Sequence, residues 1–183
     1  MILTKQLTKS KSQIANIAIA FSGSVLLALL ARLSIPVPFS PVPITGQTFG
    51  ILFLGAVLGS RIGTLSVIMY ILEGLIGLPV FAGGSIGFLY LIGPTGGYLI
   101  GFIPAIYLVG YLSEQGWMNN FSATFVAMIY GTSIIFIFGI SWLAVTAGFG
   151  TAVSIGLYPY IPGAVIKIIL ATTIVYSANR FSK

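Results

Sequence analysis

Runs of about 20 apolar residues, separated by clusters of proline and glycine, dominate this sequence. A helix needs about 20 apolar residues to cross the roughly 30 Å hydrocarbon core of a bilayer. Only 5% of the residues are charged and 57% are hydrophobic. The pattern therefore predicts an all-α integral membrane protein, because helices satisfy their own backbone hydrogen bonds in lipid.

Proline and glycine clusters mark where helices end, and this rule divides the chain into six predicted spans. Their approximate ranges are 13–33, 46–58, 62–78, 95–112, 121–146 and 159–178. The second span is short, so it is tilted into the bundle or does not cross fully. We predict one domain over residues 1–183, a bundle of six transmembrane helices preceded by a cytoplasmic tail at 1–12.

The basic residues predict the orientation, because the cytoplasmic flanks of membrane helices carry the excess of lysine and arginine. Both ends of the chain are basic, with Lys5, Lys9 and Lys11 at one end and Arg180 and Lys183 at the other. We therefore expect both termini to be cytoplasmic.

Three connections lie on the opposite side in this topology, at 34–45, 79–94 and 147–158. They contain no charged residue and are rich in proline, glycine or aromatic residues. Long loops in a compact fold are usually functional. Their grouping on one face predicts a binding site that opens outward.

Residues for catalysis or metal binding are nearly absent. The acids are Glu73 and Glu114, and the chain has no aspartate, histidine or cysteine. We expect no enzyme activity, metal site or cofactor. The basic residues lie mainly at the ends rather than in a stripe, so we expect no nucleic-acid partner.

Lys167 is the sharpest functional candidate. It lies about eight residues into the sixth predicted span, where a lysine costs roughly 2.5 to 3.5 kcal/mol unless it faces the bundle interior or a wet cavity. Contact with a ligand is one interpretation. The other is a structural pair with Glu73, or snorkelling toward the outer surface. Glu73 itself is expected to face polar groups near that surface.

Two outer segments and one helix face carry further predictions. The proline-rich stretch at 34–45 should form a semi-rigid extended strap across the mouth of the bundle, with Phe39 and Val42 in the apolar wall. "GPTGG" at 93–97 favours either an anion or carbonyl site at a helix N-terminus or close helix packing. A face of small residues in the first span, Ala20, Ser24 and Ala28, lets another helix approach, from this chain or another subunit.

Four motifs occur in order between residues 36 and 167: "PVPFSPVPITGQT", "YILEGLIGLPVF", "GPTGGYLIGF" and "YPYIPGAVIK". Together they resemble the BioY family, the biotin-binding S components of energy-coupling-factor (ECF) transporters. The resemblance implies an outward-facing biotin pocket in a bacterial cell membrane and no ATPase of the chain's own. It also implies a transmembrane coupling subunit and two ATP-binding subunits as partners, with Ala20, Ser24 and Ala28 as the docking face.

In the resemblance, Lys167 matches the family's lysine in the sixth helix, and Thr45 and Gln47 match the end of the proline loop. The predicted substrate-binding residues are Lys167, Thr45, Gln47, Phe39, Phe81, Gly84, Tyr90, Thr95, Gly97, Tyr98 and Tyr160.

One position departs from the family pattern. An aspartate usually lies three residues before the lysine, where this chain has Ala164. A carboxylate that could accept from a ureido N–H is therefore missing. Gln47 or a backbone carbonyl replaces it, or the ligand is a related carboxylate such as lipoate. A stand-alone secondary transporter is a further alternative, but it would be supported by intramembrane acids or an inverted repeat.

Overall fold

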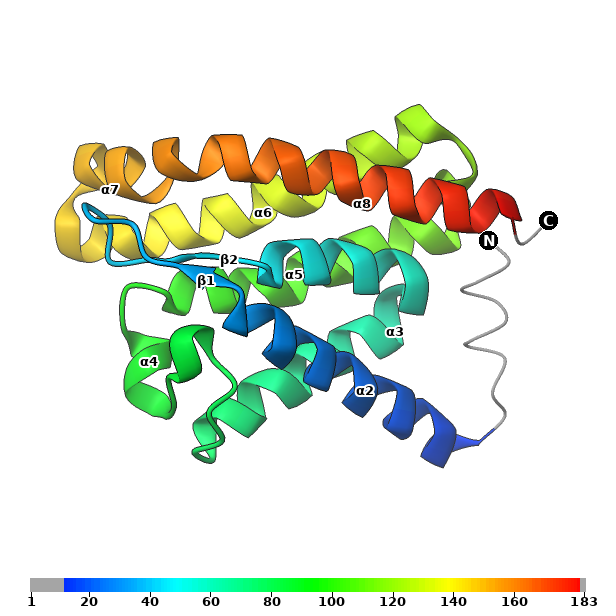
Figure 1. The fold of residues 1–183 in the computed structure, drawn as a ribbon, viewed down its shortest axis with the longest axis horizontal. Helices are drawn as coiled ribbons and strands as arrows, with labels where there is room; N and C mark the ends of the chain where they lie inside the picture. The colour runs from blue at the N-terminus through cyan, green and yellow to red at the C-terminus, as the bar shows by residue number, and fades with distance from the viewer. Residues whose placement is uncertain (1–11, 182–183) are drawn as a thin grey trace.

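The computed structural model describes residues 12–181, which form a bundle of helices (Figure 1). The long helices are α2 (Gln13–Arg32), α3 (Gln47–Leu75), α5 (Gly96–Glu114), α6 (Phe121–Ala147) and α8 (Ile161–Phe181). The shorter elements are β1 (Ser34–Ile35), β2 (Ile44–Thr45), η1 (Ala82–Gly84), α4 (Phe88–Ile92), η2 (Trp117–Asn119), α7 (Phe149–Gly156) and η3 (Tyr158–Tyr160). The basic residues at 5, 9, 11 and 183, on which part of the orientation rests, lie outside the described residues.

Within residues 12–181, five helical segments are long and apolar enough to cross a membrane. The first, fourth, fifth and sixth predicted spans agree with α2, α5, α6 and α8 to within a few residues. The helical, multi-pass character of the chain is confirmed, whereas the count of six spans stays a prediction.

The second and third predicted spans both lie in α3, which is broken at Gly59. This glycine has φ 78° and ψ −179°, a conformation that costs glycine little and other residues much. At the break the chain reverses direction, and the first half of α3 begins near the middle of the bundle (Figure 1). The break falls inside 59–61, the segment that separates the second predicted span from the third.

A carboxylate accepts hydrogen bonds from the residue that follows this break. Glu114, the last residue of α5, accepts from the Ser60 N–H at 2.7 Å and from the Ser60 hydroxyl at 2.9 Å. These bonds satisfy a donor that the interrupted helix leaves without an intrahelical partner. Gly110 of α5 packs directly against the same break, where an added Cβ would lie 2.4 Å from the Gly59 carbonyl carbon.

The small-residue face of α2 packs inside the chain. Ala20 and Ser24 are fully buried, and Ala28 is half-buried against the core. The Ser24 hydroxyl donates to the Glu73 carboxylate of α3 at 2.6 Å. The prediction that this face docks another subunit is therefore wrong, because α3 already covers it. The expectation that Glu73 meets polar groups agrees with this contact.

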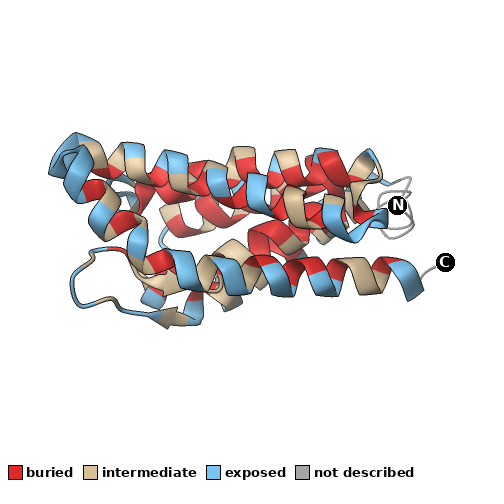
Figure 2. Cartoon of the chain, turned by 90° about the horizontal axis from the view of Figure 1, so that it is seen from above, coloured by how far each residue is buried: buried red, intermediate tan, exposed pale blue. Residues whose placement is uncertain are grey.

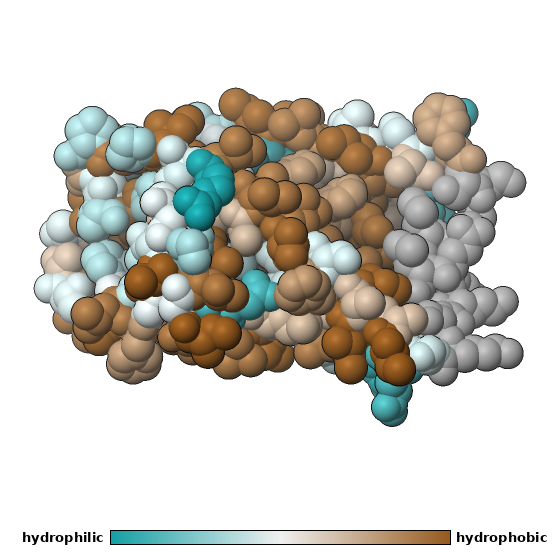
Figure 3. Space-filling model, turned by 60° about the horizontal axis from the view of Figure 1, so that its bottom comes forward, coloured by the Kyte–Doolittle hydropathy of each residue, from teal (hydrophilic) through white to brown (hydrophobic). Residues whose placement is uncertain are grey.

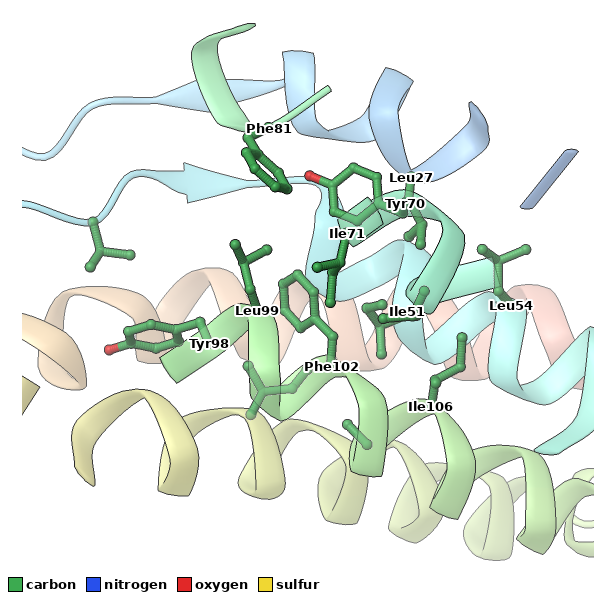
Figure 4. Close-up of a cluster of buried hydrophobic side chains, with 14 of the residues drawn as sticks. Leu27, Ile51, Leu54, Tyr70, Ile71, Phe81, Tyr98, Leu99, Phe102 and Ile106 are labelled. Atoms are coloured by element: carbon green, nitrogen blue, oxygen red, sulfur yellow. The ribbon is translucent and has the colours of Figure 1, made fainter. Parts of the chain in front are cut away.

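Apolar side chains fill the interior and also cover the outside. Buried positions lie on the facing sides of the helices (Figure 2). Ile51 and Ile106 lie in the core between α3 and α5, whereas Tyr70 lies beside Phe81 (Figure 4). Large hydrophobic residues such as Leu72 and Ile166 remain exposed, and the space-filling view shows broad hydrophobic areas (Figure 3). Such an exterior suits contact with lipid.

The two described ends of the chain lie at the same end of the bundle. The start of α2 and the end of α8 are both at the right in Figure 1, opposite the β1–β2 hairpin, α4 and α7. This arrangement agrees with both termini on one side of a membrane. That this side is cytoplasmic stays a prediction.

The contact of Gly110 with the α3 break predicts a stability difference between two glycines. Gly110→Ala should lower the free energy of unfolding by about 1 to 3 kcal/mol, because its Cβ meets backbone that must shift. Gly150→Ala is the matched control, since its Cβ would meet open space within helix α7. Thermal unfolding of both variants in detergent measures the effect, and equal midpoints would contradict the packing described.

Candidate ligand-binding site

A cavity lies among the hairpin, the first turns of α3, and helices α5, α6 and α8. Its empty volume, including the part open to solvent, is about 730 Å³. The apolar lining residues are Val42, Pro43, Ile44, Leu52, Ala82, Leu99, Phe102, Ile135, Phe136 and Ala164. The polar and aromatic ones are Thr45, Gln47, Thr48, Tyr90, Thr95, Tyr98, Thr132, Tyr160 and Lys167.

Lys167 brings a cation to this cavity from α8. Its ammonium donates to the Thr48 hydroxyl at 2.9 Å, whereas Glu73 bonds Ser24. The structure therefore does not show the Lys167–Glu73 pair that was one interpretation of the sequence. Among the described residues, none that lines the cavity carries a carboxylate. A half-buried ammonium without a side-chain counterion favours a ligand that offers negative charge or strong acceptor oxygens.

The cavity gathers most of the predicted binding residues. Those that line it are Thr45, Gln47, Tyr90, Thr95, Tyr98, Tyr160 and Lys167. Segments far apart in the sequence meet here, from the end of the proline-rich stretch to the last helix. The contact of each residue with a ligand stays a prediction.

Two predicted aromatic residues lie outside the cavity lining. Phe39 is 66% exposed on the hairpin loop, so it is not part of the apolar wall. Phe81 is fully buried one layer behind the cavity, where its ring stacks on Tyr90 with centroids 4.9 Å apart. Phe81 thus supports a lining residue. Burial raises the pKa of the Tyr90 hydroxyl above its ordinary value, so this group stays protonated at neutral pH.

The two predicted glycines also lie outside the lining. An added Cβ at Gly97 would lie 2.2 Å from the Trp142 Cβ, so this glycine lets α5 and α6 pack closely. Gly84 has φ +83° and faces the Arg32 side chain. The Thr95 hydroxyl donates to the Tyr90 carbonyl at 3.2 Å. For "GPTGG", these contacts favour the packing interpretation over the anion site.

Several lining residues were not predicted from the sequence. Thr48 and Thr132 are polar residues in apolar helices, and this is the one signal that could have identified them. Leu52, Phe102, Ile135 and Phe136 carry no such signal, because apolar residues occupy every side of these helices.

The proline-rich stretch covers the cavity as a hairpin rather than as a single extended strap. Strands β1 and β2 pair antiparallel, Ser34 with Thr45 and Ile35 with Ile44. Val42 is buried and lines the cavity, as expected. The Tyr160 hydroxyl donates to the Val42 carbonyl and is also 2.6 Å from the Ser40 hydroxyl. One side chain of η3 thus fastens the hairpin over the cavity.

A bundle of apolar helices around a covered cavity, with a lysine in its wall, is typical of a multi-pass membrane protein. The sequence model of the BioY family matches residues 4–183, which is nearly the whole chain. The chain belongs to the BioY family, as its motifs indicated.

Relatives in this family are transporters rather than enzymes. The biotin transporter BioY of Rhizobium etli is 39% identical over 160 residues, which cover 83% of this chain and 86% of the relative. The biotin transporter BioY of Thermotoga maritima is 38% identical over 141 residues, covering 76% and 82%. A crystal structure at 2.1 Å of the S-component for biotin from an ECF-type ABC transporter superposes with a TM-score of 0.82. That structure is 29% identical and covers 93% of this chain and 94% of its own.

The fastening of the hairpin by Tyr160 predicts a local change in mobility. Tyr160→Phe removes both hydroxyl contacts, so amide hydrogen exchange at residues 37–42 should become about tenfold faster. Tyr158→Phe is the control, because that side chain is 62% exposed on the same short helix. Equal exchange in the two variants would show that Tyr160 does not hold the hairpin.

Proposed function

We propose that this chain is the substrate-binding component of an ECF-type ABC transporter and captures biotin from outside the cell. The observation that carries the proposal is the Lys167 ammonium in the cavity, bonded to Thr48 and without a lining carboxylate. The relatives named as biotin transporters and the structural similarity to an S-component for biotin support the choice of ligand.

The cavity suits the chemistry of biotin. Its apolar and aromatic wall would bury the fused rings and the alkyl chain, which favours binding through the removal of apolar surface from water. An ammonium has three N–H donors. Thr48 accepts one of them, so Lys167 can donate others to a ligand oxygen. The hairpin over the cavity would limit exchange of the bound ligand with water.

Transport then needs partners. A phosphate-binding loop needs a lysine followed by serine or threonine after its glycines, and none follows "GPTGG". We expect a transmembrane coupling subunit and two ATP-binding subunits to supply the energy. In this proposal the two halves of α3 count as separate spans, which gives six, with both termini cytoplasmic in a bacterial cell membrane. Because α3 covers the small-residue face of α2, the partner surface lies elsewhere.

Lipoate is a second candidate ligand, and Ala164 is the observation that favours it. Ala164 lines the cavity at the position where the family pattern has an aspartate, and its methyl group cannot accept a hydrogen bond. A ligand with a carboxylate and no N–H donor would still satisfy Lys167. A stand-alone secondary transporter has less support, because Glu73 and Glu114 are bonded to Ser24 and Ser60 outside the cavity lining.

Equilibrium binding of biotin and of lipoate to the detergent-purified chain tests the proposal. Wild type should bind biotin more tightly than lipoate. Lys167→Ala should weaken biotin binding about 10- to 100-fold, because charge-assisted hydrogen bonds to the ligand are lost. Arg61→Ala, an exposed basic residue next to the α3 break, is the control and should bind as wild type does.

Either of two results would overturn the assignment. Tighter binding of lipoate than of biotin would move the chain to the second candidate. Equal loss of affinity in Lys167→Ala and Arg61→Ala would show that the cavity lysine has no specific role.

A further inference from the structure

We propose that Tyr70 is a positioning residue that turns the side-chain carbonyl of Gln47 toward the cavity, so that the site selects ligands carrying an N–H donor. This inference rests on the proposed function, since it concerns the same cavity, and it adds the chemical class that the cavity selects. The contacts of Gln47, Tyr70, Val80 and Lys167 carry it.

The orientation of the Gln47 amide follows from the single proton of the Tyr70 hydroxyl. That hydroxyl donates to the Val80 carbonyl at 3.1 Å, and a carbonyl can only accept. The Tyr70 oxygen is therefore left with lone pairs, and the amide group 2.6 Å from it must be the Gln47 Nε2 donor. Tyr70 thus fixes which end of the amide is which.

The same contact determines which end of the amide faces the ligand space. Gln47 lines the cavity and is 5% exposed, whereas Tyr70 is fully buried and lies behind the lining. The nitrogen end points to the core, so the Oε1 carbonyl is the end left for the cavity. Tyr70 is itself held in place by Phe81, whose ring meets it edge to face with centroids 5.6 Å apart (Figure 4).

Gln47 and Lys167 present complementary groups close together. Thr48, the residue after Gln47 in the first turn of α3, accepts from the Lys167 ammonium. The cavity therefore offers a donor for a ligand oxygen beside an acceptor for a ligand N–H. An amide or a urea carries that pair of groups on adjacent atoms. A ligand with only a carboxylate would satisfy Lys167 and leave the buried Gln47 carbonyl without a donor, which is unfavourable.

Ala164 acquires a physical explanation in this scheme. It lines the same cavity without a polar side-chain atom, so it cannot accept from the ligand. Gln47 reaches the cavity from another helix, α3, and in this proposal supplies the acceptor there. A urea-bearing ligand therefore needs no carboxylate at position 164 to have its N–H satisfied.

A double-mutant cycle for biotin binding tests the inference on the full chain in detergent. Gln47→Met keeps the side-chain length and removes the acceptor, so the Kd for biotin should rise about tenfold. Tyr70→Phe should raise it several-fold by freeing the amide to turn. The double variant should bind like Gln47→Met alone, because Tyr70 acts only through Gln47. Tyr107→Phe, an exposed tyrosine on α5, should leave the Kd unchanged.

The outcomes separate this inference from the proposed function. If wild type binds biotin through Lys167 but Gln47→Met keeps the wild-type Kd, the inference fails and the proposed function stands. If the double variant raises the Kd by the product of the two single increases, Tyr70 acts independently of Gln47, through general core packing. That result would also overturn the inference. If wild type does not bind biotin, the proposed function fails. Should Tyr70→Phe not fold, the Kd of Gln47→Met decides alone.

Discussion

The structure depends on the need of every polar group in a lipid-embedded bundle to find a partner within the protein. Three ionisable side chains in the long helices, Glu73, Glu114 and Lys167, each bond to a hydroxyl of a neighbouring helix. The two carboxylates join helix to helix away from the cavity. Lys167 instead lies in the cavity wall.

The same requirement explains where the irregular backbone lies. The β1–β2 hairpin and the loop around η1 have backbone groups without partners in a regular helix, and lipid offers them no hydrogen bonds. Both segments contribute residues to the cavity lining. In the hairpin, the Val42 carbonyl accepts a hydrogen bond from the Tyr160 hydroxyl. In the loop, the Val80 carbonyl accepts one from the Tyr70 hydroxyl. The tyrosines that stabilise the covering segments thus also shape the site beneath them.

The helix positions could be predicted from the sequence because a membrane span needs a minimum length of apolar residues. Lys167 could be identified because a charged residue within such a span is costly and therefore stands out. Which face of a helix points into the bundle could not be predicted. Ala20 and Ser24 pack inward on α3, and no pattern in a uniformly apolar helix distinguishes that side from an outer one. The pairing of Gln47 with Tyr70 was also beyond prediction, because it arises only when α3 reverses at Gly59.

In the proposed function, the cavity binds biotin with one of the ligand's oxygens at the Lys167 ammonium. A structure of the chain with biotin bound tests this most directly. We expect the ligand beneath the hairpin, with one of its oxygens within hydrogen-bond distance of the Lys167 ammonium. Biotin located outside the cavity, or inside it with apolar atoms against that ammonium, would show that Lys167 does not bind the ligand as proposed.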